Sequence, residues 1–310
     1  DKKPNFRVTT ILNAPYVVSI RDPSTLKGAA ELNNKIFDGY LIELLNILAK
    51  EAGFTYNISV VKDSMYGIED ENGEWRGLIG EIQRGEADLA VADLTITSQR
   101  EQAVDFSFPY MTFGIGLVIK KPPYFLEVGK GMVNNTIRRP LVLYPLSSIE
   151  DLPYQESIEY GAVRTGTTLS FFMTSEVHVY KMIGDKMIEN ARKLPFANSQ
   201  GVHMVKESNG RYAFFAESSS IEYILSKECD LMQFGKIINS GSYGIAMKKN
   251  FEYKTLINAA LVSMQEKGIL RRLKNKWFPK PVKCVHKPLD SVYSMNALNL
   301  VLNDIKSGKN

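Results

Sequence analysis

Cysteine and histidine are scarce in this sequence, and their scarcity excludes several classes of site. The 310 residues include two cysteines and three histidines. Structural zinc sites need four nitrogen or sulfur ligands close together, so we expect no metal site. The sequence also lacks a Gly-x-Gly-x-x-Gly nucleotide motif, a Gly-x-Ser-x-Gly nucleophile motif and a His-Glu-x-x-His motif. We therefore expect no cofactor, and a binding protein rather than an enzyme.

Long apolar runs and one-sided charge are missing as well. The most apolar segment, residues 40–49, is interrupted by Glu43 and Asn46, so no segment approaches the roughly 20 apolar residues of a membrane helix. The chain begins at Asp1 without the pattern of a signal peptide, which suggests a cytosolic protein or a mature or excised fragment. The 38 basic and 34 acidic residues are well mixed, so we expect no nucleic-acid partner.

The first third of the chain alternates between strand and helix patterns. Residues 6–12, 54–61 and 88–92 read as strands. A helix from residue 38 or 39 to Gly53 has apolar residues at an i, i+3, i+4, i+7 spacing, and residues 77–84 read as a second helix. This alternation predicts a mostly parallel sheet with helices on both faces.

A segment with six proline and glycine residues, 122–145, interrupts this pattern and reads as a linker. A second alternating set follows it. Its expected strands or extended segments are residues 159–163, 211–216, 230–234 and 243–247. Its expected helices are residues 169–173, 180–191, 200–206, 217–225 and a pair within 253–274. The tail, 291–310, contains one weak amphipathic helix.

Three groups of polar residues lie where strands end, the edge at which α/β sheets bind ligands. Arg100 stands in the first turn of a helix that Thr97 or Ser98 can cap, where the helix dipole disfavours a cation. Residues 164–168, Arg-Thr-Gly-Thr-Thr, join a strand to a helix and could form an anion site. Glu217 directly follows an apolar strand. Each group alone also has an ordinary reading as a surface charge or helix cap.

The two cysteines, Cys229 and Cys284, could be buried free thiols or could form a disulfide. Asn57 and Asn134 match the Asn-x-Ser/Thr pattern of N-glycosylation, which also arises by chance.

Several motifs occur in the order typical of one family. They are Asp38-Gly39-Tyr40, Trp75-Arg76-Gly77-Leu78-Ile79-Gly80, Leu94-Thr95-Ile96-Thr97, Gly166-Thr167-Thr168, Tyr212-Ala213-Phe214 and Lys274-Asn275-Lys276-Trp277. With these motifs the chain resembles the ligand-binding domain of ionotropic glutamate receptors, and the kainate-like branch most closely. The resemblance covers roughly residues 6–121 and 145–284.

The resemblance implies an α/β clamshell like that of periplasmic binding proteins, with two lobes and a mostly parallel sheet in each. Lobe 1 would comprise residues 1–107 and 243–290, and lobe 2 residues 108–242. The pore helices of a receptor would lie where residues 122–145 stand. The resemblance also implies an extracellular location, partner subunits of the same receptor and a disulfide between Cys229 and Cys284.

An L-amino acid, most simply L-glutamate, is the ligand that the resemblance implies. Its implied α-carboxylate site is Arg100 with Thr95, and its implied ammonium site is Glu217. Tyr66 would cover the ligand. The amides and hydroxyls around Thr167 and Thr168 would hold a side-chain carboxylate. Gly166 and Tyr243 belong to the same implied site.

Two positions depart from the family pattern. Asp93 stands where a proline or small residue is usual and adds a carboxylate near the ammonium. Asn13 replaces an acid that often bridges the lobes.

Three alternatives to a glutamate receptor domain stay open. The first is a free-standing amino-acid carrier, and the second is a receptor domain selective for glycine or another amino acid. Glycine-binding members have a tryptophan before an aspartate at the ammonium position, and this sequence has Ala216 before Glu217, which favours a larger ligand. The third is an enzyme on this fold with Asp93 as acid or base.

Overall fold

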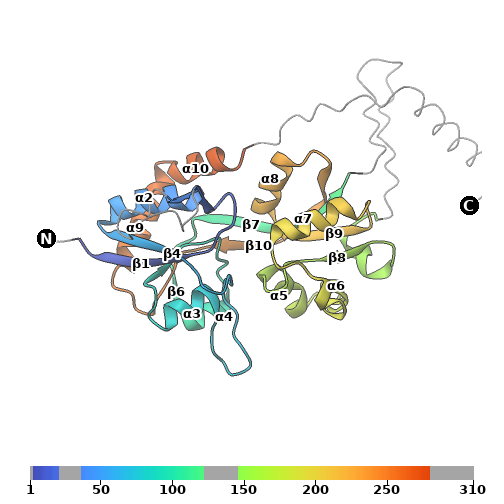
Figure 1. Cartoon of the computed structure of the whole chain (residues 1–310), viewed down its shortest axis with the longest axis horizontal. Coiled ribbons are helices and arrows are strands. Elements are labelled where there is room, and N and C mark those ends of the chain that lie inside the picture. Colours follow the sequence, from blue (N-terminus) through green and yellow to red (C-terminus); the bar gives the residue numbers. More distant parts are fainter. Residues whose placement is uncertain (1–2, 21–35, 122–145, 280–310) are drawn as a thin grey trace, which may run out of the picture.

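The computed structural model describes residues 3–20, 36–121 and 146–279. Their helices and strands form two bodies that lie side by side (Figure 1), each built on one β-sheet with helices packed against it. This two-lobed α/β architecture confirms the fold class that the sequence predicts. We call the body with the five-stranded sheet lobe 1 and the body with the four-stranded sheet lobe 2.

Lobe 1 combines the beginning and the end of the described chain. Its sheet has the order β4-β1-β5-β11-β6, in which β1 runs parallel to β4 and β5 while β11 runs antiparallel to β5 and β6. These strands are β1 (Asn5–Thr10), β4 (Thr55–Val60), β5 (Leu89–Ala90), β6 (Asp105–Phe106) and β11 (Ala246–Met247). A separate two-stranded sheet consists of β2 (Val18–Ser19) and β3 (Phe37–Asp38). The helices are α2 (Tyr40–Ala52), α3 (Gly77–Gln83), α4 (Ser98–Ala103), α9 (Lys254–Glu266) and α10 (Ile269–Trp277).

Lobe 2 is formed by the middle of the chain. Its sheet has the order β10-β7-β9-β8, with antiparallel pairs except for the parallel pair of β8 and β9. The strands are β7 (Met111–Lys120), β8 (Glu159–Gly161), β9 (Tyr212–Glu217) and β10 (Leu231–Tyr243). The helices are α5 (Thr167–Thr174), α6 (His178–Glu189), α7 (Asn198–Glu207) and α8 (Ser218–Lys227), with short 3₁₀ helices η2 (Ile149–Tyr154) and η3 (Ala191–Lys193).

The apolar stripe of α2 forms the centre of the lobe 1 core. Leu41, Leu44, Leu45 and Leu48 are completely buried, as the helical spacing predicts. Burial of a leucine side chain contributes roughly 1.5–3 kcal/mol, so this one stripe does much to hold α2 on the sheet. The helix ends at Gly53, which adopts the left-handed conformation that glycine tolerates best.

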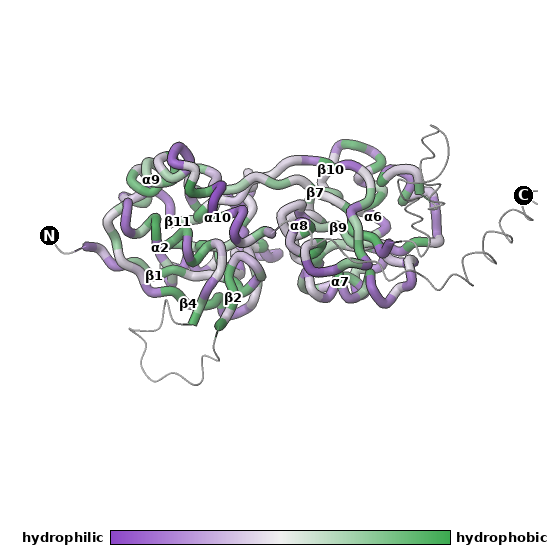
Figure 2. The backbone as a smooth tube through the Cα atoms, turned by 90° about the horizontal axis from the view of Figure 1, so that it is seen from above, coloured by the Kyte–Doolittle hydropathy of each residue, from purple (hydrophilic) through white to green (hydrophobic). Residues whose placement is uncertain are grey.

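Two strands differ from the expectation. The sequence does not predict β7, and of β10 it predicts only the first part, as residues 230–234, whereas β10 is one long strand paired with β7. The strand predicted at 243–247 contains β11. The strands β7 and β10 extend between the lobes in both views (Figures 1 and 2). The prediction of a mostly parallel sheet in each lobe is wrong, because both sheets are mixed. The lobe 1 sheet has two parallel and two antiparallel pairs, and the lobe 2 sheet has one parallel and two antiparallel pairs. The apolar run of 111–119 does not alternate, because most of its residues are buried on both faces, and a run of that kind has no period-2 signal.

Four predictions lie outside the described residues: the linker at 122–145, the tail helix at 291–310, the Asn134 glycosylation site and Cys284. The exposed Asn57 lies on β4, an edge strand. Cys229 is not a free thiol, but its pairing with Cys284 stays a prediction.

The two glycines that flank α2 provide a test of the fold. Gly39 has φ = +132°, and an added Cβ would lie 2.3 Å from the carbonyl oxygen of Tyr16. Gly53 has φ = +78° with open space around it. We predict that Gly53→Ala lowers the free energy of unfolding by about 1 kcal/mol and Gly39→Ala by about 3 kcal/mol or more. Urea unfolding followed by circular dichroism measures both, and equal losses would contradict the packing described for Gly39.

Candidate functional site

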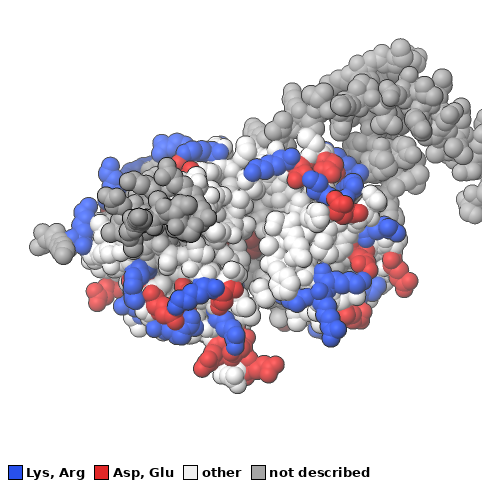
Figure 3. Space-filling model, viewed as in Figure 1, with Lys and Arg blue, Asp and Glu red and all other residues white. Residues whose placement is uncertain are grey.

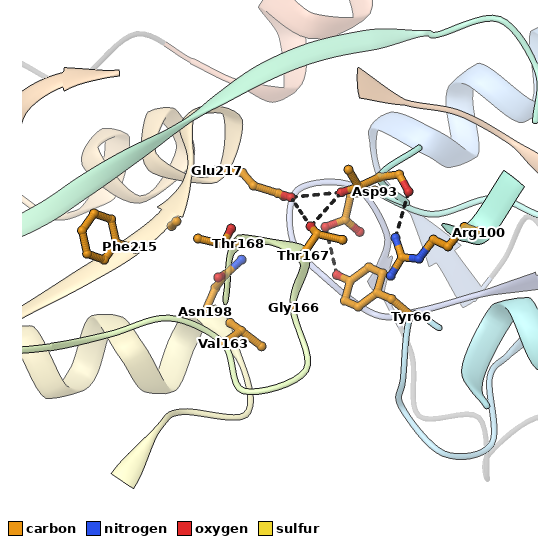
Figure 4. Close-up of a pocket in the computed structure, with 12 residues that line it drawn as sticks. Tyr66, Asp93, Arg100, Val163, Gly166, Thr167, Thr168, Asn198, Phe215 and Glu217 are labelled. Carbon is orange, nitrogen blue, oxygen red and sulfur yellow. Dashed lines mark hydrogen bonds between the residues drawn. The ribbon is translucent and has the colours of Figure 1, made fainter. Parts of the chain in front are cut away.

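The candidate site is a pocket between the two lobes. Eight of the nine residues that the sequence analysis assigns to ligand binding line it. Lobe 1 contributes Tyr66, Asp93, Thr95 and Arg100. Lobe 2 contributes Val163, Gly166, Thr167, Thr168, Asn198, Phe215, Ala216 and Glu217. Figure 3 shows the hollow between the lobes, with acidic atoms visible in its depth, and Figure 4 shows the lining side chains.

Arg100 is a buried cation held by backbone carbonyls. It lies in α4, whose first turn is capped as predicted, because the Thr97 side chain accepts a hydrogen bond from the Arg100 amide at 3.2 Å. The guanidinium donates to the carbonyl oxygens of Thr95 at 2.8 Å and Gly67 at 3.1 Å. Arg100 is only 4% exposed, and burial lowers its pKa to about 10. It therefore stays charged at neutral pH, with further N–H donors left for an anion.

Glu217, the last residue of β9, brings a carboxylate to the same pocket from lobe 2. Its Oε1 accepts hydrogen bonds from the hydroxyls of Thr95 at 3.1 Å and Thr167 at 3.3 Å. Its Oε2 accepts one from the Tyr243 hydroxyl. Burial, together with the charge of Asp93, raises the pKa of Glu217 to about 7, against the effect of these hydrogen bonds. The carboxyl group is therefore poised to ionise when a cation arrives.

Asp93 is a second buried carboxylate in the pocket, 5% exposed. Its Oδ2 accepts hydrogen bonds from the Asn13 amide at 2.7 Å and the Tyr66 hydroxyl at 2.9 Å. Burial raises the pKa of Asp93 to about 6. Asn13 thus donates hydrogen bonds to Asp93 and Tyr66, which both belong to lobe 1. The described hydrogen bonds from lobe 1 to lobe 2 at the pocket are made by Thr95.

Hydrogen bonds connect the lobes directly across the pocket. The Thr95 hydroxyl lies 3.1 Å from the Thr167 hydroxyl, in addition to its bond to Glu217. Dashed lines in Figure 4 mark this cluster. Thr167 and Thr168 open α5, with Gly166 as its N-cap residue. The free amides and positive dipole end of this helix favour an anion.

Tyr243 has a different position from the one that the sequence analysis expects. It is completely buried and is not among the residues that line the pocket. Its hydroxyl donates a hydrogen bond to Glu217 and so helps to position that carboxyl group. Its ring stacks on Phe113 of β7 with centroids 4.4 Å apart. The Ser219 hydroxyl lies 3.1 Å from its own. Tyr243 therefore connects the acidic end of the pocket to the strands that join the lobes.

Three lining residues were not predicted: Val163, Asn198 and Phe215. Asn198 is the first residue of α7, so a polar residue at a helix start was the available signal. Val163 directly precedes the predicted turn at 164–168. Phe215 lies within an apolar strand and gives no sequence signal of its own.

Within the described ranges, the structure has neither a cluster of three or more potential metal ligands nor a helix that is both long and apolar enough to cross a membrane.

Known proteins resemble this chain both in sequence and in structure. Residues 4–123 match the family model described as "Ligated ion channel L-glutamate- and glycine-binding site". The solved structure of the Drosophila muscle GluRIIB complex with glutamate has a TM-score of 0.77 and 30% sequence identity, and the match covers 89% of this chain and 99% of that one.

Curated relatives come from worm, mouse and human. The kainate-type ionotropic glutamate receptor glr-3 of Caenorhabditis elegans is 27% identical over 90% of this chain. Mouse glutamate receptor 3 is 29% identical over 94%, and human kainate-type ionotropic glutamate receptor 1 is 29% identical over 87%. The matches span 44%, 44% and 40% of those proteins.

The raised pKa of Glu217 predicts a pH-dependent stability. In the unfolded chain the carboxyl group ionises near pH 4.5, but in the ligand-free fold it ionises only near pH 7. Stability is therefore lost as the pH rises through this window and stays lost above it. We predict that Glu217→Gln has little effect at pH 4.5 and stabilises the ligand-free protein by on the order of 1–2 kcal/mol at pH 8.

Urea unfolding at the two pH values measures this difference. The matched control is Glu176→Gln, which changes an exposed glutamate of the same lobe and should show no such pH-dependent gain. A Glu217→Gln variant that is less stable than wild type at pH 8 would show that the ionised carboxylate does not destabilise the ligand-free fold.

Proposed function

This chain belongs to the family of ionotropic glutamate receptor ligand-binding domains, a family of receptor domains and not of enzymes, and from that premise we propose that it binds L-glutamate between its lobes. The observation that carries the proposal is the pair of buried opposite charges, Arg100 from lobe 1 and Glu217 from lobe 2, in one pocket. An α-amino acid carries the complementary pair on a single carbon.

The α-carboxylate binds Arg100. Charges as deeply buried as this guanidinium need a counterion or a full set of hydrogen bonds, and its two described acceptors are neutral carbonyls. A carboxylate would complete the set with charge-assisted, bidentate hydrogen bonds. The Tyr66 ring lines the pocket from the lobe 1 side (Figure 4), where it would cover the ligand.

The ammonium group binds at the other end of the pocket. Glu217 and Asp93 supply negative charge, and the Thr95 hydroxyl supplies a neutral acceptor. Both carboxylates have raised pKa values, because burial disfavours their ionised forms. A bound ammonium would offset that cost, so binding and ionisation favour each other.

The ligand side chain extends toward lobe 2. Ala216 is small and lines the pocket beside Glu217, which leaves space for more than a hydrogen atom on the α-carbon. The start of α5 lies within the pocket, and its Thr167 and Thr168 amides and hydroxyls suit an anion. A side-chain carboxylate at this position is the reason to favour glutamate over glycine or alanine.

Closure of the lobes around the ligand is the signal that we propose for the full receptor. Arg100 and Asp93 belong to lobe 1 and Glu217 to lobe 2, so the ligand is fully bound only when the lobes are together, and binding favours the closed state. Closure would then open a cation channel formed with other subunits. The division of the lobes near residues 107 and 243 is supported by the sheets, because β6 and β11 belong to one and β7 and β10 to the other.

We also propose an extracellular location, the Cys229–Cys284 disulfide and glycosylation at Asn57 and Asn134.

Arg100→Ala tests the carboxylate site. Removing one partner of a buried ion pair costs about 3–5 kcal/mol, so we predict that L-glutamate affinity falls by at least about 100-fold in calorimetric titration. The control is Arg76→Ala, an exposed arginine that pairs with Asp70, which should bind as wild type does. Wild-type affinity in the Arg100 variant would contradict the proposed orientation.

Thr168→Val tests the side-chain site. Valine keeps the shape of this buried threonine and removes its hydroxyl. We predict that the affinity for L-glutamate falls about 10-fold while that for L-alanine stays the same, since alanine has no side-chain carboxylate. Equal losses for both ligands would show that Thr168 supports the fold of the pocket and does not contact the side chain.

A further inference from the structure

Asp93 has one oxygen that is bound and one that is free. Asn13 and Tyr66 both donate to Oδ2, at 2.7 and 2.9 Å, while Oδ1 is buried and has no hydrogen-bond partner among the described residues. A buried carboxylate oxygen left unpaired is costly to the fold. Asn13 and Tyr66 hold the group in place through Oδ2, so the free oxygen has a defined position at the pocket wall (Figure 4).

The described residues offer this oxygen no cation. The hydrogen bonds that lower the pKa of Asp93 come from Asn13, Tyr66 and its own backbone. Arg100, the cation in the pocket lining, is turned to the carbonyls of Thr95 and Gly67. Asp93 instead lies close enough to Glu217 for its charge to raise the pKa of that group. Two carboxyl groups therefore face the same end of the pocket, and neither forms a salt bridge with a described residue; Arg100 and Glu217 interact only through their charges.

Three acceptors meet at this end. They are Glu217, Oδ1 of Asp93 and the Thr95 hydroxyl, which donates to Glu217 and can still accept a hydrogen bond. A primary ammonium has three N–H donors and matches these three acceptors one to one. A secondary ammonium has two donors and an alkyl group in place of the third. With a secondary ammonium, one of the three acceptors would face the alkyl carbon instead of an N–H donor. When that acceptor is the Asp93 carboxylate, a buried charge is left without a hydrogen bond.

We propose that Asp93, held by Asn13 and Tyr66, is the specificity-determining residue that selects primary-ammonium amino acids and rejects those alkylated or ring-closed at nitrogen. This inference rests on the proposed binding of an α-amino acid in the same pocket. Its physical basis is that a site built around an N–H donor rejects an analogue lacking it far more strongly than an apolar pocket rejects an extra methyl group.

The test compares two ligands that differ only at nitrogen, L-glutamate and N-methyl-L-glutamate, by calorimetric titration at pH 8. For wild type we predict an affinity ratio of at least about 100 in favour of L-glutamate. In Asp93→Asn the charge is lost but the shape is kept, and the ratio should fall to about 10 or less. Asp93→Ala gives the methyl group space, so its affinity for N-methyl-L-glutamate should exceed that of wild type.

Two controls accompany these variants. Asp70→Asn changes a carboxylate of lobe 1 that pairs with Arg76, and it should keep the wild-type ratio. Ligand-free melting confirms that each Asp93 variant is folded. Asp93→Asn removes a buried charge and keeps an acceptor for Asn13 and Tyr66, so its melting temperature should equal or exceed that of wild type.

The possible outcomes separate the two proposals. A ratio that is the same in wild type, Asp93→Asn and Asp93→Ala, with L-glutamate still bound, would overturn the role of Asp93 and leave the proposed function intact. Absence of L-glutamate binding by folded wild-type protein would overturn the proposed function and the selectivity with it.

Discussion

Buried charged groups that form no salt bridge with a described residue are the constraint on which this structure depends. Arg100 on lobe 1 interacts with neutral carbonyls, and Glu217 on lobe 2 interacts with hydroxyls. Hydrogen bonds offset part of the free-energy cost of burying each group, but they do not neutralise its charge. The two charges come from different lobes, so a single molecule with both a carboxylate and an ammonium stabilises each charge and also the contact between the lobes. In the proposed function, the free energy that burial of these charges costs the ligand-free fold is the source of the pocket's selectivity.

The acidic end of the pocket is also in contact with the strands that connect the two lobes, β7 and β10. Tyr243 lies at the end of β10, donates to Glu217 and stacks on Phe113 of β7. Thr95 and Tyr243 form an isolated β-bridge, so the backbone that accepts the Arg100 hydrogen bond runs beside the same strand. Glu217 is therefore in direct hydrogen-bond contact with a residue of one of the connecting strands.

Local patterns predicted part of the fold, whereas the site residues were predicted through the resemblance to a known family. The leucine spacing in α2 and the Thr97 cap before Arg100 are local signals, and both are confirmed. The pairing of β7 with β10 is a tertiary feature without a periodic pattern, and it could not be read from sequence. The site residues in recurring motifs were found together, whereas Asn198 and Phe215 were missed because their positions depend on how α7 and β9 pack. Asn13 was noted as a departure, but its bond to Asp93 joins residues 80 positions apart.

Under the proposed function, the ammonium of a bound amino acid favours the ionised form of carboxyl groups that burial keeps partly protonated. Calorimetric titration of the wild-type protein with L-glutamate at pH 6.5, in two buffers of different ionisation enthalpy, measures this directly. We expect binding with net release of protons, on the order of half a proton or more per ligand, because burial raises the pKa values of Glu217 and Asp93 to about 7 and about 6. Binding with the same heat in both buffers, or with proton uptake, would contradict it.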